Sequence, residues 1–449
     1  MSVAVGKIVT QVNSKILSGG QDAINTARLA GSVEAIEEIY SVANLAALPP
    51  ADDNTGRFIY VIDIGAYRYS DGTQWTNNYD TTANVTNGQL WAWGANNCGR
   101  LGDGTLSNKC SPVREFCSAT DWRAASAGYN HTAAINVSNQ LWAWGRNNCG
   151  QLGDGTTVDR CSPVREFCSA TDWCSISTGA THAIKTSGEL WGWGCNSAGM
   201  LGDGTTVTRC SPVREFCSAT DWCQVSKSCQ HTAAIKTSGQ IWAWGCGLCG
   251  RLGDGTTVSR VSPVREFCSA TDWCGVSAAV FSTAAIKTSG QIWGWGSSRF
   301  GGLGDGTTVT SFSPVREFCS ATDWCLVSAG RYHTAAIKTS GQLWVWGFNS
   351  WGQLGDGTTA SKCSPVREFC SATDWCLASI VNSSHTAAIK TSGELWAWGC
   401  NSFGRLGDGA TVNRCSPVRE FYSATDWCQV SAGSDHTAAV KITKGFNEP

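Results

Sequence analysis

Six histidines are the residues of this 449-residue sequence that could most readily carry acid–base chemistry or bind a metal ion. They lie in or beside a recurring His-Thr-Ala-Ala-Ile-Lys segment: His131, His182, His231, His333, His385 and His436. A ring of imidazoles could in principle serve either purpose. The copies depart from the pattern, however, because Ser282 takes the histidine place in one of them and His182 aligns with an alanine of the others. We therefore predict that these histidines are structural hydrogen-bonding residues.

An aspartate recurs in every copy within Leu-Gly-Asp-Gly, from Asp103 to Asp408. A calcium loop needs several further oxygen ligands at alternate positions, and the sequence does not supply them. We predict a turn in which each aspartate accepts hydrogen bonds from nearby backbone N–H groups. The Asp435-His436 pair occurs once, and no serine or cysteine can be assigned to it as a nucleophile. The sequence thus predicts no catalytic residue, no metal ligand and no cofactor.

The 24 cysteines fall into columns when the copies are aligned. One column follows Arg-Glu-Phe, a second follows Asp-Trp, a third precedes Ser-Pro-Val, and the rest lie in variable loops. The first two columns are close enough in the chain for local disulfides, but Arg123 and Tyr422 each replace one partner while the other remains. This favours reduced thiols that are buried as small apolar side chains. Cys246 and Cys249 form a lone CxxC pair, too few ligands for a zinc site.

Composition excludes several classes of protein. The net charge is −2 and only 15% of residues are charged, which argues against a nucleic-acid partner. No apolar run is long enough for a membrane span, so no membrane insertion is predicted. The first twenty residues lack the apolar core of a signal peptide.

A repeat of about fifty residues positions all these side chains. Each copy contains Leu-Trp-Ala-Trp-Gly, a glycine-rich loop, Ser-Pro-Val-Arg-Glu-Phe, Ser-Ala-Thr-Asp-Trp and His-Thr-Ala-Ala-Ile-Lys. Alternating large apolar residues predict strands, and the proline suits an outer edge strand because it lacks an N–H donor. Four short strands per copy without a helical period predict an all-β, seven-bladed β-propeller with four-stranded blades over residues 84–443. The alanine strand suits the crowded inner part of a blade, and the tryptophans suit the gaps between blades.

The two ends of the array complement each other. The first copy lacks its own His-Thr-Ala-Ala strand, and the last copy ends with His436–Lys441 without a following Leu-Trp-Ala-Trp strand. We predict that the C-terminal strands complete the first blade and close the ring, which removes open sheet edges.

The motif Gly-x-x-His-Thr-x-Ala followed by Leu-Trp-x-Trp-Gly-x-Asn-x-x-Gly-x-Leu-Gly resembles the repeat of the regulator of chromosome condensation family over residues 87–441. That resemblance implies a seven-bladed propeller. The family includes a nuclear nucleotide-exchange factor, a secreted bacterial enzyme inhibitor and many interaction modules, so the fold alone does not specify the function. The exchange role is not carried over, because this chain has no basic N-terminal arm.

Residues 1–83 do not follow the repeat. Residues 21–48 are predicted to form a helix that ends before Pro49-Pro50, and residues 57–63 and 66–69 are predicted to form strands. The pattern that continues into Ser-Asp-Gly-Thr-Gln-Trp at 70–75 resembles a small β module common in bacteriophage tail-fibre and other virion proteins. The alternative is a small domain that caps the propeller. Residues 444–449 are interpreted as a C-terminal tail.

Two loops of each copy vary freely, and a third, before Ser-Pro-Val, varies more mildly. Framework positions that we take to be exposed, such as the Lys of Ile-Lys-Thr and the Glu of Arg-Glu-Phe, hardly change. The variable loops are rich in aromatic, Arg, Asn and Ser residues, a composition typical of binding surfaces. The resemblance places both loops on the rim where partners bind. The predicted ligand-binding residues are Tyr129, Asn130, Arg146, Arg299, Phe300, Arg331, Tyr332, Phe348, Trp351, Phe403, Arg405 and Asp435. Recent duplication with relaxed loops is the alternative explanation.

These observations predict a non-enzymatic binding protein of a bacteriophage virion, such as a tail fibre, made in the host cytoplasm. The propeller rim would recognise a host-surface protein or glycan, and residues 1–83 would contact other virion proteins. Self-association into a homo-oligomer is left open. The alternative is an intracellular interaction scaffold or an enzyme inhibitor that uses the same rim.

Overall fold

The computed structural model describes residues 88–178, 181–380 and 383–442, together with four short strands between residues 40 and 77. The chain divides into two compact units, residues 1–84 and 85–449, and each is described by itself. Among the described residues, no helix has the length and apolar character that a membrane span requires.

The first unit contains one four-stranded sheet. It consists of β1 (Tyr40–Val42), β2 (Phe58–Val61), β3 (Ala66–Ser70) and β4 (Trp75–Asn77), in that order. The strand prediction at 66–69 is confirmed, and that at 57–63 is confirmed over Phe58–Val61, its other residues lying outside the described ones. The helix prediction for 21–48 is wrong at residues 40–42, because Tyr-Ser-Val there pairs in parallel with β2, as aromatic and β-branched residues readily do. The rest of that predicted helix lies outside the described residues.

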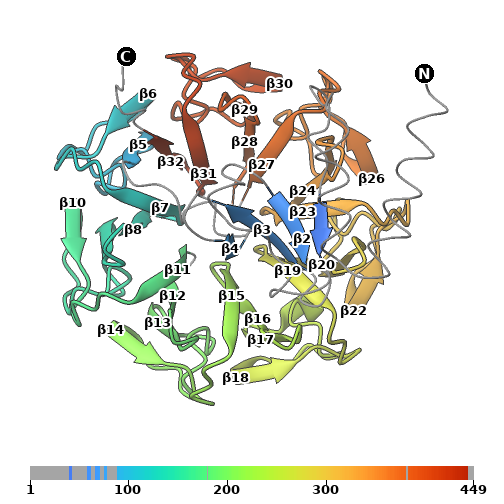
Figure 1. Cartoon of the computed structure of the whole chain (residues 1–449), viewed down its shortest axis with the longest axis horizontal. Helices are drawn as coiled ribbons and strands as arrows, with labels where there is room; N and C mark the ends of the chain where they lie inside the picture. The colour runs from blue at the N-terminus through green and yellow to red at the C-terminus, as the bar shows by residue number, and fades with distance from the viewer. Residues whose placement is uncertain are drawn as a thin grey trace, which may run out of the picture. The chain divides into compact units, whose positions relative to one another are not determined.

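The second unit is a ring of seven four-stranded antiparallel sheets, which confirms the predicted all-β propeller (Figure 1). The first four blades, from the axis outward, are β7 (Trp122–Ala127), β8 (His131–Asn136), β9 (Leu141–Gly145) and β10 (Arg160–Arg165); β11 (Trp173–Thr178), β12 (Thr181–Lys185), β13 (Leu190–Gly194) and β14 (Arg209–Arg214); β15 (Trp222–Lys227), β16 (His231–Lys236), β17 (Ile241–Gly245) and β18 (Arg260–Arg265); and β19 (Trp273–Ala278), β20 (Ser282–Lys287), β21 (Ile292–Gly296) and β22 (Ser311–Arg316).

Three further blades follow in the same order. They are β23 (Trp324–Ala329), β24 (His333–Lys338), β25 (Leu343–Gly347) and β26 (Lys362–Arg367); β27 (Trp375–Ser379), β28 (His385–Lys390), β29 (Leu395–Gly399) and β30 (Arg414–Arg419); and β31 (Trp427–Ala432), β32 (His436–Ile442), β5 (Gly88–Gly94) and β6 (Lys109–Arg114). A short 3₁₀ turn, η3 (Leu248–Gly250), follows β17.

The last of these blades closes the ring as predicted. Strand β32 from the C-terminal end pairs with β5 from the start of the array, in a register that runs from His436 opposite Gly94 to Ile442 opposite Gly88. The two ends of the repeat array are therefore joined by a full antiparallel ladder.

Each strand type lies where its side chains allow. The strand that contains the proline is the outermost one, so the missing N–H donor faces no neighbouring strand. The alanine strand is second from the axis, and its small side chains are buried. On the innermost strands, serines join neighbouring blades: Ser226 Oγ accepts a hydrogen bond from the backbone N–H of Ala278 at 2.8 Å, and Ser277 does the same for Ala329 at 2.8 Å.

Tryptophans fill the space between blades, which confirms their predicted role. Trp122 and Trp144 of one blade pack against Leu90 and Val440 of the preceding blade. The indole N–H of Trp144 donates to the backbone carbonyl of Arg100 at 3.0 Å, so the ring also fixes the preceding blade's loop.

The glutamate of Arg-Glu-Phe is buried, and the prediction that it is an exposed framework position is wrong. Glu266 is 1% exposed. Its carboxylate accepts hydrogen bonds from the backbone N–H groups of Cys268 and Ala270 at 2.6 Å each, and from the Trp273 indole at 3.4 Å. It thereby holds a turn in which Ser269 has a positive φ of 53°. The uniformity of this glutamate among the copies thus has a structural cause.

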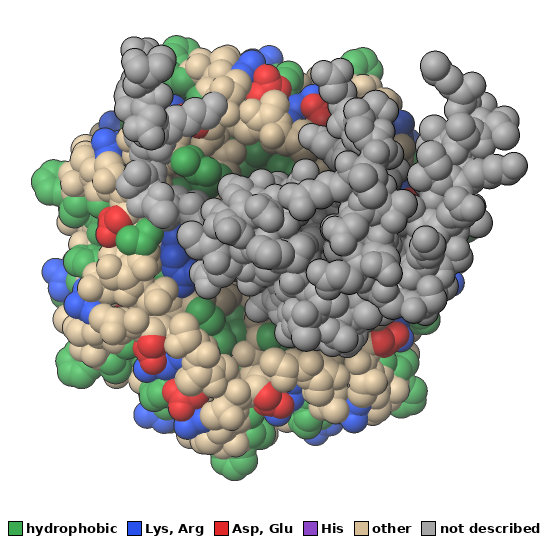
Figure 2. Space-filling model, in the orientation of Figure 1, with side chains coloured by type: hydrophobic (Ala, Val, Ile, Leu, Met, Phe, Trp, Pro, Cys, Tyr) green, Lys and Arg blue, Asp and Glu red, His purple; other side chains and the backbone are tan. Residues whose placement is uncertain are grey.

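The neighbouring phenylalanine is exposed instead. Phe267 is 66% exposed and lies against Gly255, where any Cβ would collide with its ring. Figure 2 shows hydrophobic side chains beside Lys and Arg at several points along the outer edge of the ring.

Candidate functional site

Five of the six histidines connect neighbouring blades, which confirms the structural prediction for these five. The side-chain Nε2 of His131 is 3.0 Å from Thr181 Oγ1, and the same contact joins His231 to Thr283 at 2.7 Å. Equivalent pairs are His333–Thr386, His385–Thr437 and His436–Thr132. Burial, with a smaller effect of Arg100, lowers the pKa of His131 to about 4, and burial lowers that of His333 to about 3. These rings are neutral at pH 7 and act as fixed hydrogen-bonding groups.

The two departures from the histidine pattern are confirmed in the register. His182 lies opposite Gly192 across the strand pair, the place that Ala133 takes opposite Ala143 in the preceding blade. A Cβ on Gly192 would come within 2.7 Å of the His182 ring, so the glycine provides the space that the larger side chain needs. Ser282 opens β20 at the histidine position.

The repeated aspartates hold loops, as predicted. Asp154 Oδ1 accepts hydrogen bonds from the backbone N–H of Thr156 at 3.0 Å and from the Asn147 side chain at 3.0 Å. Arg160 forms an ion pair with the same carboxylate at 3.1 Å. In the part of the chain that the structure describes, no group of three or more His, Cys, Asp or Glu residues is placed to hold a metal ion.

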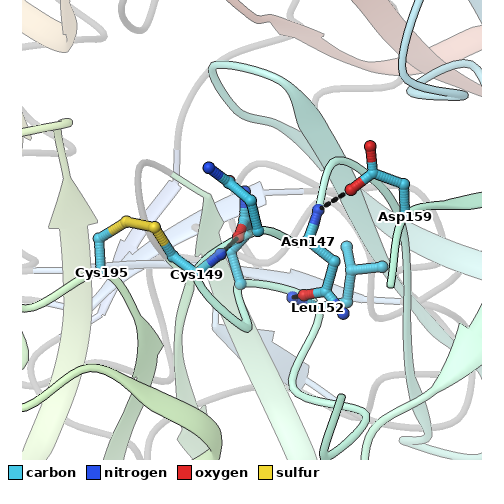
Figure 3. The surroundings of a disulfide bond; sticks show 7 residues. Asn147, Cys149, Leu152, Asp159 and Cys195 are labelled. Carbon is cyan, nitrogen blue, oxygen red and sulfur yellow. Dashed lines mark hydrogen bonds between the residues drawn. A yellow bond between two sulfur atoms is a disulfide. The ribbon is translucent and has the colours of Figure 1, made fainter. Parts of the chain in front are cut away.

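One disulfide forms, and it is not one of the local pairs considered from the sequence. Cys149 in the β9–β10 loop is bonded to Cys195 in the β13–β14 loop of the next blade, with the Cα atoms 5.2 Å apart (Figure 3). Figure 3 also shows Asn147, which organises the same loop by accepting a hydrogen bond from the backbone N–H of Leu152 at 2.9 Å.

The other cysteines are free. Cys400 is buried, eleven are half-buried and ten are exposed, so the prediction of burial is wrong for the exposed ones. The column after Arg-Glu-Phe is exposed because its residues lie on the turn that the buried glutamate holds. In the column after Asp-Trp, burial raises the pKa of Cys325 to about 11 and that of Cys428 to about 12. These two thiols are protonated at neutral pH, which makes them poor nucleophiles.

Corresponding positions of adjacent variable loops meet each other. The disulfide joins the fourth residue of one loop, Cys149, to the first residue of the next, Cys195. Phe300 is likewise the fourth residue of the β21–β22 loop, and Phe348 is the first residue of the β25–β26 loop in the next blade. Their ring centroids are 4.7 Å apart. Variation at these positions therefore serves contacts between loops, which the sequence comparison alone did not reveal.

Five aromatic side chains come together on two adjacent blades, and we call them the aromatic patch. They are Phe281 from the β19–β20 loop, Phe300 from the β21–β22 loop, Tyr332 from the β23–β24 loop, and Phe348 and Trp351 from the β25–β26 loop. Phe281 and Tyr332 stack with centroids 5.2 Å apart, and Phe348 meets Tyr332 at 5.8 Å and Trp351 at 5.3 Å.

Two arginines lie on this patch with their charge unpaired. The guanidinium carbon of Arg299 is 5.3 Å from the Phe300 centroid, and that of Arg331 is 5.3 Å from the Tyr332 centroid. Arg146 is also exposed, on the β9–β10 loop. Among the described residues, these are the three arginines whose side chains make no hydrogen bond or ion pair, and all three lie in variable loops.

The remaining predicted site residues lie outside the patch. Arg405 is 4% exposed and forms an ion pair with Asp435 at 2.9 Å, so both side chains hold loops of adjacent blades together. Tyr129 and Phe403 are exposed, and Asn130 is half-buried. The patch and the two arginines on it thus bring together six of the twelve predicted residues, namely Arg299, Phe300, Arg331, Tyr332, Phe348 and Trp351.

Two features were missing from the predicted site. Phe281 belongs to the patch. It could have been found from the sequence, because it is an aromatic residue in the variable loop directly before Ser282. Lys227 is fully buried at the end of β15, where four other copies have alanine, and burial lowers its pKa to about 7. Its Nζ donates to the backbone carbonyl of Ser228 at 2.7 Å.

Comparison with known proteins gives a family match across most of the propeller. The model described as regulator of chromosome condensation (RCC1) repeat matches residues 87–135, 138–184, 187–235, 289–337, 340–375 and 392–440. Ultraviolet-B receptor UVR8 of Arabidopsis thaliana is 31% identical over 325 residues, which cover 70% of this chain and 73% of that protein. E3 ubiquitin-protein ligase HERC2 of Homo sapiens is 25% identical over 370 residues, which cover 78% of this chain but only 6% of that protein.

Solved structures share the fold. Prp20p from Saccharomyces cerevisiae superposes with a TM-score of 0.72 at 19% identity and covers 82% of this chain and 95% of its own. Human WBSCR16 superposes with a TM-score of 0.69 at 20% identity and covers 80% of this chain and 99% of its own. At these identities the likeness shows the fold alone.

Proposed function

Since the chain belongs to the regulator of chromosome condensation (RCC1) repeat family, we propose that its propeller is a non-enzymatic binding module whose aromatic patch recognises another macromolecule. The relatives suggest a binding or regulatory protein: one is named a receptor, and Prp20p is described with its binding to Gsp1p and histones. The observation that carries the proposal is the patch itself. Five rings with two unpaired arginines match the residue types that dominate binding energy at protein interfaces.

The test compares two variants of the full chain. Arg299→Ala/Arg331→Ala/Trp351→Ala removes exposed parts of the patch and should keep the melting temperature within a few degrees, because none of these side chains is buried. Arg146→Ala is the matched control, another exposed arginine in a variable loop of a blade that does not carry the patch. Cross-linking with mass spectrometry on host surface fractions should identify a partner that the control retains and the triple variant loses. Retention by both variants would refute the role of the patch.

The narrower proposal is that the protein belongs to a bacteriophage virion, as a tail-fibre or surface protein that binds a host-surface molecule. Its support is the sequence pattern of residues 41–75, which resembles a module of such proteins and would contact other virion components. Mass spectrometry of purified particles tests it directly. Absence from the particles would reject this assignment and favour an intracellular scaffold or enzyme inhibitor.

A further inference from the structure

The aromatic patch carries positive charge that the loops building it do not balance. The loop residues that build it, 279–281, 297–302, 330–332 and 348–353, contain no aspartate or glutamate. The side chains of Arg299 and Arg331 make no hydrogen bond or ion pair within the described residues. The patch therefore presents two guanidinium groups with free N–H donors beside an apolar surface.

Several other arginines of the ring are paired with carboxylates. In the β13–β14 and β17–β18 loops of other blades, Arg209 pairs with Asp203 at 3.1 Å and Arg260 with Asp254 at 2.9 Å. Arg405 pairs with Asp435 at 2.9 Å. The repeat thus offers carboxylates at regular positions, and the two arginines of the patch lie beyond their reach. A bound partner could supply the missing negative charge.

The arrangement of the rings limits what kind of partner fits. Arg299 and Arg331 lie over Phe300 and Tyr332, and Phe281 stacks on Tyr332 at an interplanar angle of 19°. Faces that a sugar ring would stack on are therefore partly occupied. What remains is an uneven apolar surface with Trp351 38% exposed at its edge. Such a surface suits a protruding side chain, and a guanidinium stacked on a ring keeps its N–H edge available for a carboxylate.

We propose that the aromatic patch binds an acidic protein segment in which an apolar side chain packs beside Phe348 and Trp351 while flanking carboxylates pair with Arg299 and Arg331. This rests on the proposed function and specifies the chemistry of its partner. Bidentate carboxylate–guanidinium pairs supply the specificity, and the apolar contact supplies most of the burial.

The experiment uses the full chain and synthetic twelve-residue peptides with a central Leu, Phe or Trp and from none to four glutamates. Affinity should rise with each glutamate only when the apolar residue is present, and it should fall with added salt. Arg299→Gln/Arg331→Gln should weaken the acidic peptides about tenfold, and Trp351→Ala should weaken every peptide with an apolar anchor. Arg146→Gln, which removes an equal charge outside the patch, should leave the affinities unchanged.

A second arm replaces the peptides with heparin, which shares the negative charge but is a glycan. Tighter binding of heparin than of the acidic peptides, with the same dependence on Arg299 and Arg331, would overturn the proposal in favour of an anionic glycan. It would also be overturned by the absence of peptide binding up to about 1 mM, or by equal binding of neutral and acidic peptides. If the triple alanine variant still loses the natural partner in those cases, the function stands and only the partner's chemistry is wrong.

Discussion

The two rims of the propeller come from the same repeat but treat their charges differently. The rim formed by the Lys-Thr-Ser-Gly turns and the Asp-Trp connections is nearly uniform, and we call it the uniform rim. There, Lys236 pairs with Asp221 at 2.8 Å and lies 4.9 Å from the Trp222 ring centroid, and most other blades repeat the arrangement. The opposite rim, which we call the variable rim, carries the loop before each alanine strand and the loop after each Leu-Trp-Ala-Trp strand. There the side chains of Arg146, Arg299 and Arg331 are unpaired within the described residues.

The comparison shows that the number of substitutions at a position does not distinguish a structural role from a binding role. The uniform rim hardly varies because its charges and its buried glutamates have partners that hold the turns. On the variable rim, some positions vary because adjacent loops contact each other, as Cys149–Cys195 and Phe300–Phe348 do. Only the contacts distinguish a residue that holds two loops together from one that is free to bind a partner.

Acidification should produce the largest effect, at the strand ends beside the variable rim where the histidines lie. Burial depresses their folded pKa values below the ordinary 6.5, to about 4 for His131 and about 3 for His333. The unfolded chain therefore binds more protons below pH 6.5, and stability falls as the pH drops through that window. His131 and His333 should each cost about 2 kcal/mol at pH 5.

Denaturant titrations at pH 7 and pH 5, followed by tryptophan fluorescence, measure this loss. His333→Ser should reduce the loss of stability between pH 7 and pH 5 by the contribution of one histidine. The serine should be tolerated, because Ser282 already occupies the same position in another blade. A free energy of unfolding that stays constant between pH 7 and 5 would contradict the prediction.

The uniform rim should be the more sensitive to single substitutions. Glu266→Ala leaves two backbone N–H groups without their acceptor and should lower the free energy of unfolding by about 4 kcal/mol. Arg331→Ala on the variable rim should change it by less than about 0.5 kcal/mol. Thermal and urea unfolding of both variants test the contrast, which fails if the two losses are similar.

The smallest effect tests whether corresponding loop positions meet throughout the variable rim. Ala198 is the fourth residue of its loop and Cys246 is the first residue of the next, the positions that Cys149 and Cys195 occupy one blade earlier. Ala198→Cys should therefore form a disulfide with Cys246 and stabilise the chain by about 2 kcal/mol. Peptide mapping under non-reducing conditions detects the bond. A free thiol at both positions would show that this contact between adjacent loops is confined to Cys149–Cys195 and Phe300–Phe348.

Much of the fold was predictable because the repeat supplies its own comparison. Alternation identified the Leu-Trp-Ala-Trp strand, the proline identified the outer edge, and the complementary ends identified the closing ladder from His436 to Ile442. Each of these inferences uses backbone geometry or local side-chain size, which a short segment already contains. The site was less predictable. The variable loops were identified from the sequence, but it did not show which of their residues form the aromatic patch, which form an ion pair and which join adjacent loops.

The sequence by itself determined the seven blades, the direction of closure, the turn role of the aspartates and the structural role of the histidines. Only the tertiary structure decided that Glu266 is buried, that Phe281 joins the aromatic patch, and that Arg405 is held by Asp435 while Arg331 is not. The physical reason is that strand formation depends on neighbours in the chain, whereas burial and charge pairing depend on which loops of different blades come within a few ångströms of each other.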